Sequence, residues 1–434
     1  MQQLIFIIVT VLSFGFFGYT VFRILSYFKL TKEHAYPTLD NIGERITHTL
    51  LVAFGQSKIL KKPVAGLLHA LVYWGFLVIT VGTLEMIIDG LFGTQRILSR
   101  LGGIYDVVTI SGEVFAALII ISCVIFLIRR YIVKPKRFTA PEMKPSSRMD
   151  ATVILSMILL LMFSLLGMNI GYLNNGGEIH GSFPISNMFA SSIAGMNLHT
   201  FEIVNWWIHI SLVFIFLNVL PYSKHFHVIL AVPNVFLERL GPKGRLNSME
   251  SVTKEVKLMM NPDTAFAPPP EGEQAEIPRF GVKDIEDVSW KTLMDSYTCT
   301  ECGRCTDVCP ANITGKLLSP RKLYIDARQR MKDKGDALIK DSSYSDGKFL
   351  VGDYITEEEL WACTTCGACM EECPVDINHV PFIIDMRRSL VMEESKAPAS
   401  INMMMTNIEN NGAPWQFSAS DRMNWADELF TNDE

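Results

Sequence analysis

The chain has 434 residues, of which 49% are hydrophobic and 19% are charged, and its formal net charge at neutral pH is -6. This composition is too apolar for a water-soluble protein of this size, so we expect a membrane protein. The net charge excludes little, because basic loops and an acidic tail cancel within it. We expect no nucleic-acid partner.

The apolar residues are concentrated in the first half of the chain, in stretches long enough to cross a bilayer, which takes about 20 residues. Five spans are predicted, at residues 3–27, 64–92, 104–128, 151–173 and 201–221. The first resembles a signal peptide, but it lacks a basic start and a small-residue cleavage site, and its apolar run is too long. We interpret it as a retained transmembrane helix.

Lysine and arginine are distributed unevenly among the segments that join these spans. Basic clusters occupy the connection between spans one and two and that between spans three and four, whereas residues 174–200 contain neither residue. Because basic loops stay on the cytoplasmic side, we expect a protein of the cytoplasmic (inner) membrane with its N-terminus outside. Everything after span five then lies in the cytoplasm.

Several histidines fall within or beside the spans, where an ionisable side chain is costly and usually functional. A pair of buried imidazoles is how a helical bundle holds a b-type haem. His209 and His227 are 18 residues apart, or five whole turns of a continuous helix and roughly 27 Å, so they would share one face. His69, at the start of span two, would lie level with His227. We expect these two to ligate an inner haem b; His225 is the competitor, but it would point to the opposite side.

An outer haem would use His209, but no other histidine is predicted at its depth in another helix. The remaining partners are His199 and His180, which we place in the outer loop. The alternative for a single membrane histidine is a hydrogen bond to a neighbouring helix or to a quinone. We therefore predict one or two haems b. The candidate ligands are His69, His209, His227 and His199.

Eight of the nine cysteines, beyond a linker expected at residues 241–290, form two copies of the pattern Cys-x2-Cys-x2-Cys-x3-Cys-Pro. The first copy is Cys299, Cys302, Cys305 and Cys309, and the second is Cys363, Cys366, Cys369 and Cys373. This spacing holds a pair of [4Fe–4S] clusters, with the fourth cysteine of each run ligating the other run's cluster. Cys373 is thus assigned to the first cluster and Cys309 to the second.

Zinc and disulfides are the two alternatives for these cysteines. Zinc sites usually pair two short cysteine or histidine hooks. Disulfides need an oxidising compartment, and the predicted topology puts this region in the cytoplasm. Cys123 lies inside an apolar span, where we expect a small buried hydrophobic residue.

These features predict an all-α membrane bundle of five transmembrane helices followed by an α-helical two-[4Fe–4S] ferredoxin-like domain. The expected divisions are a membrane domain at 1–240, the linker at 241–290, the ferredoxin domain at 291–395 and a tail at 396–434. The tail is too poor in apolar residues to fold alone, so we expect it to dock on a partner. Its alternative is a frayed terminus.

The spans resemble the gamma subunit of respiratory nitrate reductase, a dihaem quinol-oxidising anchor, at residues 207–209 and 220–227 and around His69. In that family two histidines of span five and two of span two ligate haems, and the second span-two position here is Ile79. Residues from about 275 resemble the iron–sulfur part of the heterodisulfide reductase and glycerol-3-phosphate dehydrogenase group. The resemblance lies at residues 297–305, 314–321, 411–415 and 422–425.

The order of these parts is similar to the first half of membrane-bound electron-transfer flavoprotein:menaquinone oxidoreductases. In those proteins two cysteine-rich CCG domains follow the tail, whereas this sequence ends at Glu434. The resemblance implies a separate CCG-domain, heterodisulfide reductase-like subunit that docks on the tail. It also implies electron-transfer flavoprotein as the donor and menaquinone as the acceptor.

We therefore expect an oxidoreductase subunit that passes electrons between a cytoplasmic partner and menaquinone through two clusters and haem b. One alternative is a quinol-oxidising, heterodisulfide reductase-like subunit that runs electrons the other way. Another is a redox anchor or sensor without turnover. The sequence has no evident nucleophile, glycine-rich nucleotide loop or general-base constellation, so no catalytic residue is assigned.

Overall fold

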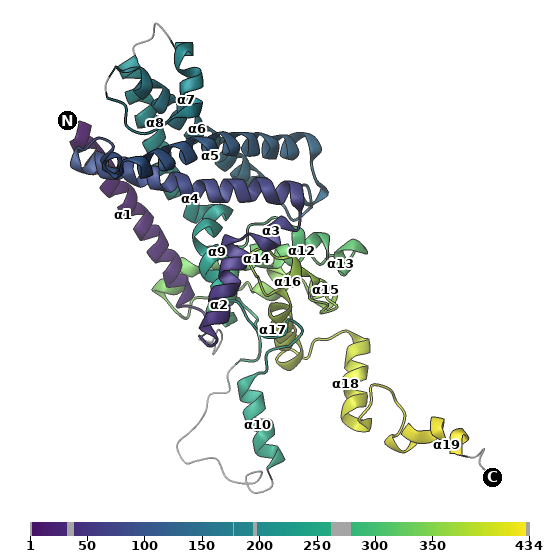
Figure 1. Cartoon of the computed structure of the whole chain (residues 1–434). Helices are drawn as coiled ribbons and strands as arrows, with labels where there is room; N and C mark the ends of the chain where they lie inside the picture. Colours follow the sequence, from purple (N-terminus) through teal and green to yellow (C-terminus); the bar gives the residue numbers. More distant parts are fainter. Residues whose placement is uncertain (1, 33–38, 177, 194–197, 262–278, 431–434) are drawn as a thin grey trace.

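The computed structural model describes residues 2–32, 39–176, 178–193, 198–261 and 279–430, and within these ranges every regular element is a helix (Figure 1). Five helices in these ranges are long and apolar enough to cross a membrane, which confirms the predicted spans. Their bounds are α1 Gln2–Phe28, α4 Pro63–Phe92, α5 Gly103–Ile128, α6 Pro145–Asn174 and α8 Leu198–Val219. The predicted all-helical fold class is also confirmed.

The bundle is built around α5, which packs against α4 on one side and α6 on the other, while α6 also lies along α8. The interior between α5 and α6 is closed by Ala116, Ile119 and Cys123, so Cys123 is the buried small residue that the sequence predicts. Glycines allow two of these helices to approach closely, since a Cβ at Gly75 would lie 2.8 Å from Ile119 of α5. Small residues at helix contacts are typical of membrane bundles.

The helix α1 is arranged for contact with lipid. Its small polar residues Thr10, Ser13 and Thr20 are buried against the bundle, whereas large apolar residues such as Leu12 and Phe22 are exposed. In water this arrangement would be unfavourable, but lipid tails are as apolar as these side chains. The outer surface of α1 is therefore suited to a bilayer.

The second half of the chain folds into shorter helices below the bundle (Figure 1). Between the two parts lie α2 Ile42–Thr49, α3 Ser57–Leu60 and α9 His227–Phe236. The cysteine domain comprises α11 Trp290–Thr298, α12 Arg304–Asp307, α13 Pro310–Ile313, α14 Pro320–Lys340, α15 Glu357–Trp361, α16 Ala368–Glu372 and α17 His379–Met392. The remaining helices are α7 Pro184–Phe189, α10 Glu250–Met260, α18 Ala399–Asn411 and α19 Asn424–Phe430.

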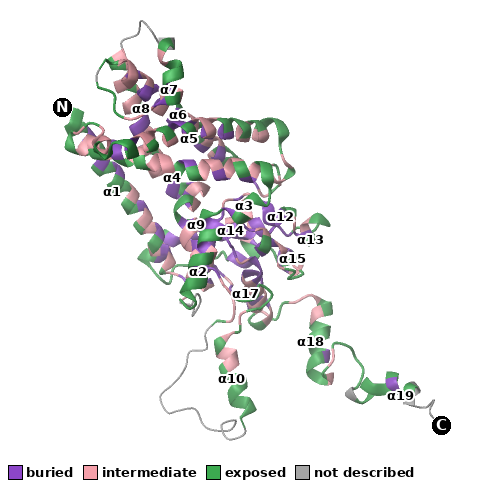
Figure 2. Cartoon of the chain, viewed as in Figure 1, coloured by how far each residue is buried: buried purple, intermediate pink, exposed green. Residues whose placement is uncertain are grey.

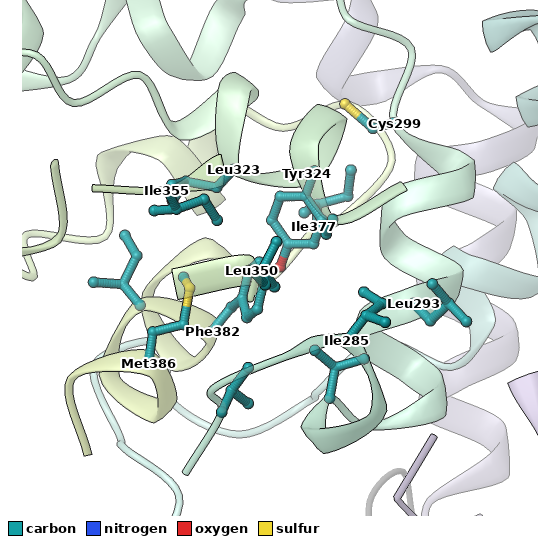
Figure 3. Close-up of a cluster of buried hydrophobic side chains, with 14 of the residues drawn as sticks. Ile285, Leu293, Cys299, Leu323, Tyr324, Leu350, Ile355, Ile377, Phe382 and Met386 are labelled. Atoms are coloured by element: carbon teal, nitrogen blue, oxygen red, sulfur yellow. The ribbon is translucent and has the colours of Figure 1, made fainter. Parts of the chain in front are cut away.

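The larger of the two apolar clusters in the cysteine domain reaches the first cysteine (Figure 3). Leu323 and Tyr324 of α14 and Phe382 of α17 meet there. Ile285 and Val288 also belong to this core, although the sequence places them in the linker. This segment is too short for its apolar periodicity to predict a helix or a strand. The proline-rich part of the predicted linker, residues 262–278, lies outside the described residues.

A buried ion cluster joins the former linker segment to α14. Both oxygens of Asp284 accept from Arg330, at 2.8 and 2.7 Å, and Lys334 Nζ lies 3.0 Å from Asp284 Oδ2. Burial alone would raise the pKa of Asp284, but the hydrogen bonds from Arg330 and Lys334 hold that pKa below its usual value. The carboxylate therefore remains charged and fixes this segment to the domain.

We expect Asp284→Asn to destabilise the cysteine domain by about 3–5 kcal/mol, because it leaves two buried cations short of a countercharge. The midpoint of thermal unfolding of the purified full chain, followed by circular dichroism, measures the effect. Asp341→Asn is the matched control, since Asp341 is exposed beyond α14 and bonds only to nearby Ser343. Equal midpoints for the two variants would contradict the role of the cluster.

The cysteine domain docks on one end of the bundle through the basic segments between spans. Arg23 and Tyr27 at the end of α1 both bond to Asp336 of α14, with the Tyr27 hydroxyl 2.6 Å from Oδ1. Arg137 donates to Asp307 at 2.9 Å, and Lys58 pairs with buried Asp376. The two basic connections therefore lie at the same end of the bundle as the cysteine domain.

Three helices stand apart from the packed structure. The helices α10, α18 and α19 extend from it and are largely exposed (Figure 2). In α18, Met403, Met404 and Ile408 are exposed to solvent. The predicted tail thus has local helical structure and an uncovered apolar surface; its last residues, 431–434, lie outside the described residues.

Candidate functional site

The two cysteine loops have the same local backbone geometry. In the first, Glu301 and Gly303 have φ of 56° and 76°; in the second, Thr365 and Gly367 have φ of 54° and 75°. Left-handed residues at the same two positions curl each loop so that its three cysteines face inward, and glycine takes this conformation without strain. A short helix, α12 or α16, then begins and carries the third cysteine of each run. The sequence repeat is therefore also a structural repeat.

In the structure, cysteines of each run lie near cysteines of the other run. Cys373 is close enough to Cys302 and Cys305 for their charges to interact. Cys309 interacts in the same way with Cys363 and Cys369. Cys305 also interacts with Cys369, so the cysteines of the two loops lie close together and the exchange of the fourth ligand stays a prediction. This arrangement suits two clusters with crossed ligation.

The chemistry of these donors also suits iron–sulfur clusters. Burial raises the pKa of Cys299 to about 11 and that of Cys369 to about 12, so these thiols stay protonated until a metal displaces the proton. Backbone N–H groups point at the sulfurs, from Thr365 to Cys363 and from Ile377 to Cys373, each at 3.4 Å. Such hydrogen bonds stabilise the thiolate and tune the potential of a cluster.

A zinc site would need a tighter arrangement. Four thiolates around one zinc ion lie about 2.3 Å from the metal, whereas an iron–sulfide cube keeps its thiolates further apart. Within the described ranges, no three histidine, cysteine or acidic side chains are close enough together to hold a single metal ion. The cysteine spacing favours the clusters.

The two cysteine groups differ in their surroundings. In the group containing Cys299, three of the four cysteines are buried, whereas Cys366 in the other group is exposed. Arg304, next to Cys305, donates to the carbonyls of Lys58 and Ile59, at 2.8 and 3.1 Å. The first group therefore faces the membrane bundle and the second faces solvent.

Charged residues to which the sequence analysis assigns no role surround the first group. Arg328 donates to the Cys299 carbonyl at 3.3 Å and pairs with Glu301. Burial alone would raise the pKa of Glu301, but Arg328 and Lys224 outweigh it and keep that pKa below its usual value. The spacing of these residues carried no signal, because they come from separate segments of the chain. They place positive charge beside a cluster whose thiolates are negative.

His69 and His227 are brought together, as predicted, and their charges interact. The Nδ1 of His227 donates to the Lys224 carbonyl at 3.0 Å, which leaves Nε2 free for a metal. Burial, with smaller contributions from His225 and His69, lowers the pKa of His227 to about 3. Its imidazole is therefore neutral, the form that binds iron. His69 Nδ1 is buried with no hydrogen-bond partner among the described residues. This nitrogen is therefore available to interact with a bound group.

His209 and His227 do not lie on one continuous helix, so the prediction of a shared face is wrong. The helix α8 ends at Val219, and Ser223 is extended with ψ of 155° before α9 begins at His227. Pro221 and this extended residue break the helix, so the 18-residue spacing fixes no common face. His225 also does not point away from His227, because their ring centroids are 5.9 Å apart.

His225 nevertheless has partners of its own. Its Nδ1 lies 2.9 Å from Ser223 Oγ and 3.6 Å from Asp150 Oδ2. His225 is also close enough to His69 for their charges to interact. Because both His225 and His227 are bonded through Nδ1, the preference for His227 as a haem ligand stays a prediction.

His209 is buried at the other end of the bundle, where its Nδ1 donates to the Leu161 carbonyl at 2.9 Å. His199 is not in a loop but in the first turn of the same helix, ten residues earlier, or about 15 Å along the axis. Two imidazoles on one helix at that separation cannot approach one iron from opposite sides. His180 is exposed. The structure thus offers His209 no evident counter-ligand among the described histidines.

The other described histidines have structural roles. His379 is buried in the cysteine domain, where its Nδ1 donates to the Ile377 carbonyl at 3.1 Å and burial lowers its pKa to about 4. His48 Nε2 lies 2.8 Å from Asp376 Oδ2. His34 lies outside the described residues.

Fold and cysteine geometry together define a five-helix bundle of membrane type that carries a dicluster iron–sulfur domain. Residues 291–374 match the family model of the 4Fe-4S dicluster domain. The chain is 33% identical to a probable iron-sulfur-binding oxidoreductase FadF of Bacillus subtilis, over 98% of this chain and 61% of that protein. It is 29% identical to an EtfAB:quinone oxidoreductase of Syntrophomonas wolfei, over 90% of this chain and 55% of that protein.

A shorter similarity covers 36% of this chain and 25% of a probable membrane-anchored ferredoxin of Chromohalobacter salexigens, at 37% identity. No solved structure matches the chain. The chain thus spans only 61% and 55% of the two long relatives. These findings match the iron–sulfur oxidoreductase family that the sequence resembles, and they support a redox function for the chain.

Proposed function

We propose that this chain is the membrane electron-transfer subunit of a quinone-linked oxidoreductase. It would pass electrons between a cytoplasmic partner and menaquinone, using two [4Fe–4S] clusters held by the eight cysteines and a haem b held by His69 and His227. Bound clusters and haem supply one-electron redox chemistry. The chain itself binds them, sets their surroundings and keeps water away.

The order of the ligand groups carries this proposal. The group with Cys366 reaches the surface, where a soluble partner has access. The group with Cys299 lies behind it, against α3 of the membrane part. Arg304, in the loop of that group, is close enough to His69 for their charges to interact. The three ligand sets thus follow one another in space, from the solvent to the bundle.

Neighbouring residues hold the two cysteine groups and the histidine pair in fixed relative positions. Lys58 of α3 pairs with Asp376, three residues after Cys373, and also feels the charge of Cys373 itself. Lys224, whose carbonyl orients His227, lies 3.8 Å from Glu301 of the first cysteine loop. A displacement of either loop would therefore disturb the histidine pair. Such coupling keeps the distances between the ligand groups constant.

The placement of the basic segments supports the expected topology. They lie at the end of the bundle that bears the cysteine domain, and basic segments stay in the cytoplasm. We therefore infer that the cysteine domain is cytoplasmic in the inner membrane and that the N-terminus is outside. Electrons would then enter the bundle from the cytoplasmic side.

The partner is inferred from the relatives and from the tail. One relative is named an EtfAB:quinone oxidoreductase, which supports electron-transfer flavoprotein as the donor. The exposed methionines of α18, together with exposed Trp415 and Trp425, form a surface that suits a separate CCG-domain subunit. Such a subunit would stand between the flavoprotein and Cys366.

The test is to purify the chain with its bound partners and to identify them. We expect iron and acid-labile sulfide for two clusters, a b-type haem spectrum, and reduction of a water-soluble naphthoquinone by reduced electron-transfer flavoprotein. If quinol reduces the clusters but the flavoprotein does not, the direction of flow is reversed. A haem that never responds to quinone or quinol would refute the quinone-linked function.

A further inference from the structure

Four arginines gather at the end of α5, where the bundle meets the cysteine domain. Arg129 and Arg130 belong to the helical turn that continues α5, Arg137 to the next short turn, and Arg304 to the first cysteine loop. Arg129 is close enough to Arg137 and Arg304 for their charges to interact. We call these four residues the arginine cluster.

A single aromatic ring lies among three members of the cluster. The guanidinium carbons of Arg129, Arg130 and Arg137 lie 5.4, 5.7 and 5.6 Å from the centroid of the Phe138 ring. A cation within about 6 Å of an aromatic ring is attracted to the ring's face, but a neutral ring cannot cancel three positive charges. The three guanidiniums therefore repel one another across it.

The carboxylates of the described chain compensate for little of this charge. Asp307 pairs with Arg137 at 2.9 Å, whereas Arg304 donates to two backbone carbonyls of α3. Within the described residues, neither Arg129 nor Arg130 forms an ion pair with a carboxylate. One ion pair therefore stands against four guanidiniums.

Asp150 is the further carboxylate whose charge reaches the cluster, at Arg130. This carboxylate also lies 3.6 Å from His225 and accepts from the Lys224 N–H at 3.3 Å. Arg130 itself donates to the Arg148 carbonyl at 2.6 Å, which brings another positive side chain near it. The cluster thus has an excess of positive charge.

Apolar side chains flank Arg129 and Arg130 along the chain. The exposed ones are Ile128, Tyr131, Ile132 and Val133. This stretch ends the apolar span Gly103–Val133. Exposed apolar residues beside arginines, at the end of a membrane helix, match the boundary between acyl chains and headgroups, where long basic side chains extend toward phosphates.

The segment that follows α5 also supports the first cysteine loop. The Arg137 carbonyl accepts from Arg321 at 2.8 Å. A Cβ added at Gly303 would lie 3.2 Å from the Cβ of Arg137, so the loop and this segment are in close contact. An anion at the arginine cluster would therefore lie at the junction of the two parts of the chain and would stabilise it.

We propose that the arginine cluster binds the phosphate of an anionic phospholipid from the adjacent leaflet, with Arg129 and Arg130 donating to it. The acyl chains would lie against the exposed apolar residues that flank this pair. The phosphate would offset the repulsion around Phe138 and so fasten the cysteine domain to the bundle. A soluble anion has the charge but no acyl chains, so it would bind more weakly. This site does not depend on the direction of electron flow.

The first test measures lipid binding to the purified full chain by native mass spectrometry, after detergent has removed the lipid that copurifies. We expect phosphatidylglycerol to bind more tightly than phosphatidylcholine. A basic residue near an anionic surface contributes about fivefold to binding, so Arg129→Gln and Arg130→Gln should each weaken the binding of phosphatidylglycerol by about fivefold. Lys29→Gln is the control, because it removes an exposed positive charge just after α1 and should keep the wild-type affinity.

A crosslinking experiment on the wild-type chain does not depend on how the variants fold. The full chain is placed in phosphatidylcholine vesicles that contain a photoreactive phosphatidylglycerol. We expect crosslinks to residues 128–138, which unlabelled phosphatidylglycerol should prevent and an excess of inorganic phosphate should not. Crosslinks confined to other segments, competition by inorganic phosphate, equal affinity for the two lipids, or an equal loss of binding in Lys29→Gln would each overturn the proposal.

Discussion

Replacing Cys309 by serine should abolish the cluster otherwise held by Cys363, Cys366 and Cys369, and should leave the cluster of its own run in place. The reason is that Cys309 interacts with Cys363 and Cys369 in the second loop, whereas Cys373 returns to the first loop. Iron per chain should fall by about half, and turnover with quinone should be lost because the route from the surface is interrupted. Electron paramagnetic resonance of the reduced protein measures which cluster remains.

Two further variants make this result specific. Cys373→Ser should remove the other signal, that of the buried cluster facing the bundle. Cys123→Ser is the matched control, because Cys123 is buried inside the bundle between α5 and α6 and should leave both signals unchanged. If Cys309→Ser and Cys299→Ser were to lose the same cluster, each run would bind its own cluster and the crossed arrangement would be refuted.

The cysteine geometry could be predicted from sequence because its determinants are local. Three of the four ligands of each group lie within seven residues, and the left-handed positions at Gly303 and Gly367 follow from residue type. The five spans were predictable for a similar reason, since a bilayer imposes length and apolarity on each helix separately. The assignment of the fourth ligand to the other loop is also predicted from the repeat, and the cysteine variants above test it.

The surroundings of the site could not be predicted in the same way. Arg328, Lys224 and Glu301 form one group of charges, but they come from three distant segments of the chain. Ile285 appeared to lie in a linker because a single short turn has no periodicity, and only its burial against α14 shows its role. Interactions that depend on tertiary packing leave no mark in spacing.

The prediction of the histidine pair from the sequence contained an error. The helical count from His209 to His227 assumed a continuous helix, and the extended Ser223 breaks it. Pro221 indicates that the helix is interrupted, but it does not indicate where the chain runs after the interruption. What brings His69 and His227 together is the packing of α9 below the bundle, which also places His225 beside His227.

Replacing His227 by alanine should therefore remove the inner haem, whereas His225→Ala should retain it. His227 has its Nδ1 tied to the Lys224 carbonyl at 3.0 Å, so its Nε2 is oriented and free, as in a ligating histidine. His225 is also bonded through its Nδ1, to Ser223 and Asp150, so the haem contents of the two variants decide between the two histidines. The pyridine haemochrome content of the purified chains measures the difference, and the iron–sulfur signals of both variants report that the cysteine domain is intact.

The functional consequence distinguishes a ligand from a packing residue. In His227→Ala both clusters should still be reduced by the cytoplasmic donor, because the cysteine groups are unaffected, but quinone reduction should stop. If His227 served only packing, its replacement would lower the stability of the chain. Haem content and turnover would then fall in the same proportion. Normal haem content in His227→Ala would exclude the pair with His69. Loss of haem in His225→Ala alone would transfer the assignment to its neighbour, whose ring centroid is 5.9 Å away.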